Sequence, residues 1–396
     1  MSNNLIEFLS NFGNVEDKIT NLKDSFGITA TNDDLLPNLY SLNYHMTDSP
    51  KTHPIVRECR SIIVDLENDK VVARSFNRFY NLGEAKNIIE IELGDNSVAT
   101  EKIDGSLFML YNYNGIWYPA TRKTTTARNS FMKVHNGVDN VAIPMLQIIQ
   151  EYFDIDIVWD IDSTECSGNW VTEESYDAFI KLLQDKLETL NKDYTYVCEI
   201  VSPYNTVVSK FANSDIYLLT IMDKEGNTID SDTTIFSIPE ARKVQSEEDI
   251  YEFIKYLQSV RDYLVEGVVV MDNNSNLAKI KSSVYVAVHL AGSELPTTNS
   301  IIKVVAAFEE DEYLTYFPEH SELLLPFITK RDSLIADTNT AYEYALLLKS
   351  NGSNNKVIVQ ALLGNYNKNA VSIVMAALNT EKPITYNPGI LGKNIR

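Results

Sequence analysis

Hydrophobic and polar positions divide the chain into two parts with different periods. Up to about residue 290, apolar residues occur mostly in short runs bounded by polar turns, which predict β-strands. The strands expected there are 60–66 with 71–76, a further pair at 97–103 and 107–120 with a turn at 112–115, and 194–202, 215–222, 266–271 and 278–281. Because strands and helices do not alternate at βαβ spacing, we predict a mainly antiparallel α+β fold.

Helical periods are expected at fewer places in this first part. Residues 1–30 carry the apolar stripe of one or two amphipathic helices, and similar patterns cover 136–154 and 176–190. The aromatic-rich segment 35–50 has no clear period and is expected to be irregular.

After about residue 290 the alternation disappears and a helical period replaces it. Four helical segments are expected there, at 298–316, 321–350, 355–364 and 368–380. We therefore predict two domains, residues 1–292 and an all-α domain at 293–396.

Composition and charge exclude several classes of protein. No apolar run reaches the length of a membrane span, and the N-terminus lacks a secretory signal. The 3 cysteines form no CxxC pair and the 5 histidines lack metal-binding spacing, which favours a reducing, intracellular setting without a zinc site. A net charge of −21 excludes a general basic coat, so phosphate must be bound by a local cluster of Lys and Arg.

The candidate chemistry centres on residues 101–107, Glu-Lys-Ile-Asp-Gly-Ser-Leu. Lys102 ends an apolar run, and Gly105 permits a tight turn or a close approach to a ligand. Lys102 could therefore point into a pocket as a nucleophile. For the isolated tetrapeptide, a hairpin turn with a solvated lysine is the better interpretation.

Other charged residues also lie at strand ends. Lys279 and Lys281 leave one face of a strand, where two ammonium groups favour an anion such as a polyphosphate between or beside them; the alternative is a solvated strand face. Glu199 and Glu266 lie at the edges of apolar strands. Each is either an ion-pair partner or a ligand for a sugar hydroxyl or Mg²⁺.

In this order, the motifs resemble the covalent nucleotidyltransferase superfamily of ATP-dependent DNA and RNA ligases and mRNA capping enzymes. The narrower resemblance is to the T-even phage RNA ligase 1 family and covers about residues 40–290. The matching stretches are Arg57 to Ile62, Ser75 to Glu84, Lys102 to Leu107, Glu199 to Asn205 and Lys279 to His289.

The resemblance implies an ATP-dependent RNA ligase that joins 5′-phosphate and 3′-hydroxyl ends by in-line phosphoryl displacements. Lys102 would take AMP from ATP, the AMP would pass to the 5′-phosphate of RNA, and a 3′-hydroxyl would displace it. The implied cofactors are ATP and Mg²⁺, with Mn²⁺ as a substitute. The implied partners are single-stranded RNA or a tRNA cut in its anticodon loop, and a separate end-healing kinase/phosphatase. The implied location is the cytoplasm of a phage-infected bacterium, with no membrane involved.

The resemblance also implies roles for individual residues beside the catalytic Lys102. The residues expected to bind ATP are Tyr44, Arg60, Arg78, Tyr80, Glu199, Lys279 and Lys281. Other active-site positions are Asp104, Gly105, Arg122, Glu266, Gly267 and Tyr285. Metal ligands are expected at Glu266 and Asp311, although Asp311 can equally be a solvated residue of an acidic helix face.

Two alternatives remain open. A DNA ligase or capping enzyme would follow Lys-x-Lys with an OB-fold, which the helical period of 293–396 disfavours. A catalytically silent RNA-binding relative is disfavoured by the intact charged motifs and the acidic composition. The helical domain is a candidate for RNA specificity. Residues 155–193 are interpreted as a peripheral insertion, because the acidic stretch 154–162 would repel RNA.

Overall fold

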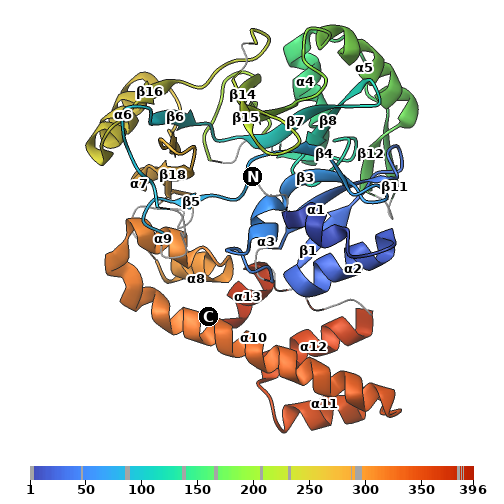
Figure 1. The fold of residues 1–396 in the computed structure, drawn as a ribbon. Helices are drawn as coiled ribbons and strands as arrows, with labels where there is room; N and C mark the ends of the chain where they lie inside the picture. The colour runs from blue at the N-terminus through green and yellow to red at the C-terminus, as the bar shows by residue number, and fades with distance from the viewer. Residues whose placement is uncertain are drawn as a thin grey trace. The chain divides into compact units, whose positions relative to one another are not determined.

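The computed structural model describes all residues except 1–3, 46–47, 85–89, 136–139, 165–167, 206–207, 231–232, 287, 290–296, 381–383, 385 and 387. Contacts within the chain divide it into two compact units. Unit 1 comprises residues 1–82 and 86–282, and unit 2 comprises 83–85 and 283–396. Figure 1 shows mixed helices and sheets in unit 1 and helices in unit 2.

Three larger sheets form the body of unit 1. The first has the order β1-β2-β3-β4, with bounds Ile28–Thr31, Leu39–Tyr44, Arg60–Asp65 and Lys70–Arg74. The second has the order β15-β14-β13-β7-β8, with bounds Thr228–Ile229, Asp215–Met222, Thr195–Val201, Ser106–Tyr113 and Ile116–Thr121. The third has the order β16-β6-β17-β18-β5, with bounds Ala241–Lys243, Val98–Lys102, Gly267–Met271, Leu277–Lys281 and Tyr80–Asn81.

These three sheets are antiparallel throughout, except that β5 runs parallel to β18. Two short hairpins complete the strands of unit 1: β9 (Phe131–His135) with β10 (Asn140–Pro144), and β11 (Ile161–Thr164) with β12 (Gly168–Val171). The mixed helix and antiparallel-sheet architecture confirms the predicted α+β class.

Helices cover the sheets of unit 1 with their apolar faces. Their bounds are α1 Asn4–Leu9, α2 Val15–Phe26, α3 Pro54–Glu58, α4 Leu146–Phe153, α5 Glu173–Lys186 and α6 Glu247–Val260. Phe179 and Leu183 of α5 belong to the largest core, beside β8, as Figure 1 lets the reader follow. Helix α5, within the segment 155–193, therefore packs into the core of unit 1; the standing of the segment as an insertion remains a prediction.

The third sheet, which carries Lys102, is backed by α6. A capping box between Ser246 and Asp249 starts this helix. Its Phe253 and Leu257 are fully buried against Val268 of β17. This packing fixes the strand from which Lys102 projects.

Unit 2 is helical where the structure describes it. Its elements are α7 Ser283–Val286, α8 Thr298–Ala306, α9 Glu310–Tyr316, η2 Pro318–His320, α10 Ser321–Ser350, α11 Asn355–Leu363, α12 Lys368–Thr380 and α13 Pro388–Asn394. Of the four expected segments, three match single helices and 298–316 is split into α8 and α9. None of the helices in the described residues is long and apolar enough to cross a membrane.

Three expectations for unit 1 were wrong. The segment expected to be irregular contains β2, which gains its order by pairing with β1 and β3. Strand 97–103 does not pair with 107–120, because β6 and β7 join different sheets; the expected turn at 112–115 is present, but it joins β7 to β8. The helix expected over 136–154 begins only at Leu146, since β10 pairs with β9 before it.

Candidate active site

Lys102 stands where the chain passes from one sheet to the next. It is the last residue of β6, and only residues 103–105 separate it from β7 in the second sheet. A Cβ on Gly105 would lie 2.3 Å from the carbonyl oxygen of Ile200. The crossing therefore requires glycine here, because any side chain would push the loop away from β13.

Asp104 holds this crossing loop in place. The residue is 5% exposed, and its Oδ2 accepts hydrogen bonds from the backbone N–H groups of Val208 (2.9 Å) and Ser209 (2.7 Å). A carboxylate that accepts two backbone donors is well satisfied despite its burial. Asp104 thus acts as a structural anchor beside the lysine.

Glu266 bridges two of the predicted lysines. Its Oε2 lies 2.6 Å from Lys102 Nζ and its Oε1 lies 3.2 Å from Lys281 Nζ. The register explains this meeting, because Gly267 of β17 lies opposite Lys102 on one side and Lys281 on the other. Glu266 is therefore an ion-pair partner in this structure, one of the two roles left open by the sequence.

Gly267 makes this three-strand register possible. Its φ of 148° lies outside the range that L side chains adopt readily, and a Cβ would lie 2.1 Å from the carbonyl oxygen of Ile280. Any other amino acid at position 267 would displace the strands that carry Lys102 and Lys281.

Glu199 lies close to the same group but is not paired. Among the residues described, its carboxylate has neither a hydrogen-bond nor an ion-pair partner. Burial raises its pKa to about 7; Lys102 and Arg60 oppose this rise, while Glu266 and Asp104 add to it. A half-buried carboxylate without a partner is suited to accept a hydroxyl or a cation that is not part of the protein.

Three arginines gather around Tyr44 near these groups. Arg78 donates a 2.6 Å hydrogen bond from Nη1 to the Tyr44 hydroxyl and lies over both the Tyr44 and Tyr80 rings. Arg122 covers the Tyr44 ring at 5.5 Å. Arg60 is the first residue of β3, and its pKa is lowered by burial and by repulsion from the other two arginines.

This arginine cluster (Arg60, Arg78 and Arg122) has no carboxylate bound to it. None of the three makes an ion pair within the described part of the chain, and the Nε atoms of Arg78 and Arg122 are buried without an acceptor. Burial raises the pKa of Tyr44, but the three guanidinium groups outweigh it and lower the pKa. All these features indicate a site prepared for an anion.

Local backbone geometry places Arg60 and Arg78. Ser61, which directly follows Arg60, has a left-handed φ of 65°, and a β-bulge interrupts the pairing of β2 with β3 next to it. Backbone hydrogen bonding from Arg78 N to Arg57 O, at 2.8 Å, fixes the loop after β4. Tyr80 then enters β5 beside β18, with Asn81 opposite Lys279.

The remaining predicted residues lie in unit 2. The ring of Tyr285 is buried and stacks on His289 with centroids 5.5 Å apart. Asp311 lies in the first turn of α9, next to Glu310, which pairs with Arg331 at 2.7 Å. Their roles toward Lys102 remain predictions.

Sequence reasoning missed a buried ion pair behind Lys102. The side chain of Glu101 is 1% exposed and receives hydrogen bonds from Arg261 Nε at 3.1 Å and from the Tyr263 hydroxyl at 2.7 Å. The alternation of β6 contained the signal, because Ala99 and Glu101 share the buried face. This pair anchors the strand end from the side opposite Lys102.

The carboxylates beside Lys102 are of the kind that binds a divalent metal ion. No group of three or more metal-binding side chains occurs within the described ranges. Glu199 and Glu266 supply two carboxylates, which suits Mg²⁺ or Mn²⁺ because such ions are usually held by one or two carboxylates together with substrate phosphates.

Comparisons with known proteins agree with the charged motifs. A family model for RNA ligase, of the T4 RNA ligase 1 type, matches residues 58–286. A protein of Autographa californica nuclear polyhedrosis virus described as a bifunctional polynucleotide kinase/RNA ligase is 27% identical over 329 residues. The match covers 80% of this chain but only 42% of that relative.

Solved structures give weaker likenesses. An archaeal ATP-dependent RNA ligase has a TM-score of 0.43 at 12% identity, covering 79% of this chain and 71% of that one. A chain described as an ATP-dependent DNA ligase from Aquifex aeolicus also has a TM-score of 0.43 at 12% identity, covering 93% and 81%. At these TM-scores neither likeness bears on the function.

Proposed function

The chain belongs to the T4 RNA ligase 1 family, and from this premise we propose that it is an ATP-dependent RNA ligase whose nucleophile is Lys102. The observation that carries the proposal is the meeting of Lys102, Glu266 and Lys281 beside the unpaired Glu199 and the arginine cluster. A nucleophilic lysine next to several cations without carboxylate partners fits transfer of a nucleotide from a polyphosphate.

The first step requires Lys102 as a free amine. Its nitrogen is held by Glu266 at 2.6 Å, and this contact must open before the nitrogen can attack phosphorus. Glu266 must therefore release Lys102 when ATP binds, and Lys281 remains to balance the carboxylate. Lys102 gives up its proton to solvent, its nitrogen then bonds to the α-phosphorus, the bond from the α-phosphorus to the bridging oxygen breaks, and pyrophosphate leaves.

The arginine cluster would receive the phosphates of ATP or of the RNA end. Guanidinium groups bind phosphate oxygens through paired N–H donors, and the buried Nε donors of Arg78 and Arg122 are free for this purpose. Both guanidinium groups lie against the Tyr44 ring. Tyr44 is therefore better placed to orient phosphate ligands than to stack on adenine.

Mg²⁺ or Mn²⁺ would be held by Glu199 and Glu266 together with substrate phosphates. When bound, such an ion supplies charge neutralisation at the reacting phosphate. Glu199 could instead accept a ribose hydroxyl, because its carboxylate has no partner in the described residues. The protein's own contribution is to hold these two carboxylates on neighbouring sheets through Gly105 and Gly267.

In the later steps the AMP passes from Lys102 to a 5′-phosphate, and a 3′-hydroxyl displaces it to seal the strand. The substrate we propose is single-stranded RNA or a tRNA cut in its anticodon loop, with the helical unit contributing RNA specificity. RNA that lacks these ends would need a separate kinase and phosphatase. The matched viral relative is described as a kinase joined to an RNA ligase, which is consistent with such a partnership.

The test is joining of 5′-phosphorylated single-stranded RNA in the presence of ATP and Mg²⁺, beside a nicked DNA duplex and with GTP replacing ATP. The proposal predicts sealed RNA with ATP and little product from the DNA or with GTP. Preferred sealing of the nicked DNA would indicate a DNA ligase, and a requirement for GTP would indicate a capping enzyme. Binding of RNA without any sealing or adenylation would indicate a silent relative.

A further inference from the structure

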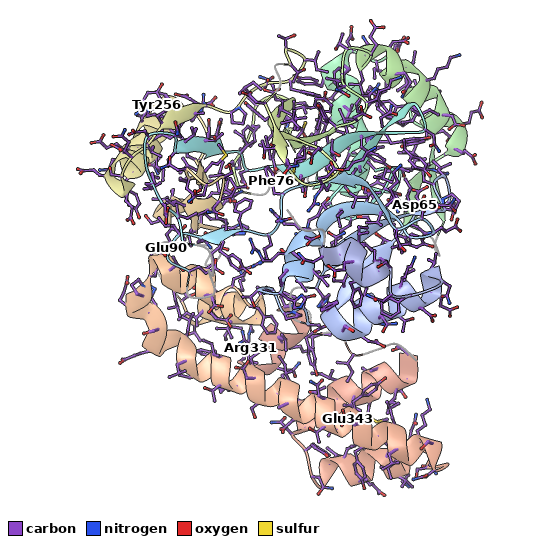
Figure 2. All side chains as sticks on the ribbon, in the orientation of Figure 1. Asp65, Phe76, Glu90, Tyr256, Arg331 and Glu343 are labelled. Carbon is purple, nitrogen blue, oxygen red and sulfur yellow. The ribbon has the colours of Figure 1, made fainter. Side chains whose placement is uncertain are left out.

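A cleft of about 570 Å³ lies at the opposite end of the strands from Lys102. Its walls include the β3–β4 turn and the β7–β8 turn, whereas Arg60 and Ser106 begin β3 and β7 at the other end. Of the residues labelled in Figure 2, Asp65 ends β3 at the turn, and Phe76 follows β4 at the other end of the hairpin. The cleft is therefore separate from the site around Lys102.

Three lysines from distant parts of the sequence line this cleft. Lys70 starts β4, Lys192 precedes β13 and Lys224 follows β14. None of their ammonium groups has a hydrogen-bond or ion-pair partner among the residues that the structure describes. In a chain of net charge −21, three unpaired ammonium groups around one cleft favour an anionic ligand.

Two carboxylates also line the cleft, but one of them is already occupied. Asp65 accepts hydrogen bonds from the backbone N–H groups of Glu67 and Asn68, both at 3.1 Å, and from Asn68 Nδ2 at 2.9 Å. Asp193 is the other lining carboxylate. The three lysines therefore outnumber the two carboxylates, and the charged side chains that line the cleft carry a net positive charge.

Asn112 supplies a buried donor that needs an acceptor. Its Oδ1 accepts a hydrogen bond from Gly115 N at 3.0 Å, which fixes the orientation of the amide. Its Nδ2 is buried and, within the described residues, has no acceptor. An unsatisfied buried donor costs about 1–3 kcal/mol, and Asn112 is one of the residues that line the cleft.

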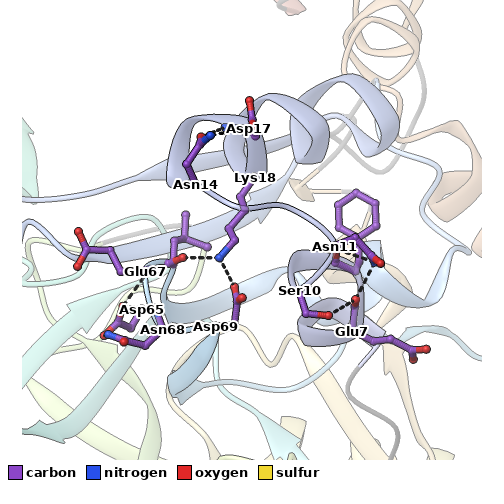
Figure 3. A network of polar contacts seen from close by, with 12 residues as sticks. Glu7, Ser10, Asn11, Asn14, Asp17, Lys18, Asp65, Glu67, Asn68 and Asp69 are labelled. Atoms are coloured by element: carbon purple, nitrogen blue, oxygen red, sulfur yellow. Dashed lines mark hydrogen bonds and ion pairs between the residues drawn. The ribbon is translucent and has the colours of Figure 1, made fainter.

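One wall of the cleft is held rigidly before any ligand binds. Lys18 of α2 donates a hydrogen bond to the carbonyl oxygen of Leu66 at 2.8 Å and pairs with Asp69 at 2.6 Å, as Figure 3 shows. The Lys18 side chain is 4% exposed. Lys18 therefore holds the β3–β4 turn in place before a ligand binds, so binding does not have to order this turn.

We propose that this cleft binds the sugar–phosphate backbone of the RNA whose end is joined at Lys102, an inference that rests on the proposed function. Along β7, from Ser106 to Tyr113, the chain spans about 23 Å at 3.3 Å per residue. With a phosphate about every 3.4 Å, a helical strand would cover that distance with on the order of seven nucleotides. Only RNA longer than this span contacts both sites.

The test compares two triple variants that each change the net charge from −21 to −24. The cleft variant carries Lys70→Gln, Lys192→Gln and Lys224→Gln. The matched control carries Lys23→Gln, Lys181→Gln and Lys255→Gln, all exposed residues of unit 1. Urea unfolding checks that both variants fold like the wild-type protein.

Binding of labelled RNA is measured by fluorescence anisotropy over a range of salt concentrations, with one RNA several times longer than the span and one shorter. For the long RNA, the cleft variant should bind at least tenfold more weakly, and its salt slope should fall by about 2, since each lost phosphate contact contributes about 0.7. The short RNA and the control variant should show neither change.

Equal weakening of the long and the short RNA, equal weakening by the control, or no weakening at all would overturn the proposal. Because binding is measured directly, these outcomes do not depend on catalysis. Failure of the wild-type protein to join RNA would instead contradict the proposed function. The two failures are therefore distinguishable in the same set of proteins.

Discussion

Replacing Glu199 with glutamine should remove a pH-dependent cost to stability. Burial raises the Glu199 pKa from 4.5 to about 7, which corresponds to about 3 kcal/mol between the neutral and charged forms. Because the pKa of Glu199 is higher in the folded protein than in the unfolded chain, its burial costs no stability below about pH 4.5, where it is protonated in both states. The cost grows as the pH rises from there through about 7. Glutamine is neutral throughout and keeps the shape of the side chain.

The assay is urea unfolding of the wild type and of Glu199→Gln at pH values on both sides of this range. The variant should become more stable relative to the wild type as pH rises, by up to about 3 kcal/mol. Glu188→Gln, at an exposed position, controls for the loss of one negative charge. A difference that stays constant with pH, or that shifts in favour of the wild type at high pH, would contradict a raised pKa of Glu199.

Three further changes test the surroundings of Lys102. Gly105→Ala places a Cβ 2.3 Å from a backbone oxygen of β13, so we expect the unfolding free energy to fall by about 2 kcal/mol and adenylation to be lost. Gly13→Ala, whose Cβ meets open space, is the control and should change neither quantity. Arg78→Ala removes a hydrogen bond and a positive charge from Tyr44, so the Tyr44 pKa should rise in an ultraviolet titration, and an unchanged value would contradict the cluster. Arg261→Ala leaves the buried carboxylate of Glu101 without its ion-pair partner and should lower the unfolding free energy by about 2–3 kcal/mol. This loss is smaller than for a fully buried pair, because the Arg261 side chain is 30% exposed. A loss below about 1 kcal/mol would oppose an anchoring role.

The helical unit was the part of the fold most readily predicted. Helical periods depend on neighbouring residues, and the expected segment 321–350 coincides with α10. The break between α8 and α9 was missed because the left-handed φ of 60° at Phe308 is not visible in the apolar pattern. The terminal helix α13 is short and carries few periodic residues.

Strand pairing was less predictable because it depends on distant partners. The run that became β6 reads as one half of a hairpin with β7, yet β6 pairs with β16 and β17 instead. The tight crossing at Gly105 brings the two sheets together and cannot be told from a hairpin turn by local pattern. Likewise, β2 acquires order only through β1 and β3.

Motif order predicted much of the candidate site. It predicted that Lys102, Glu266 and Lys281 share one site, and in the structure these residues meet across three strands. It did not predict which glutamate is paired, because Glu199 and Glu266 look alike at their strand edges. The Glu101–Arg261 pair was missed since its two members are far apart in the chain and no motif links them.

The central claim is that Lys102 carries AMP covalently. The direct measurement is incubation of the wild type and Lys102→Ala with α-labelled ATP and Mg²⁺, followed by denaturing electrophoresis and peptide mapping. We expect a labelled band in the wild type, with the label on the peptide containing Lys102, and no band in the variant. Label that persists in Lys102→Ala, or no label in the wild type with any nucleotide or divalent metal, would contradict it.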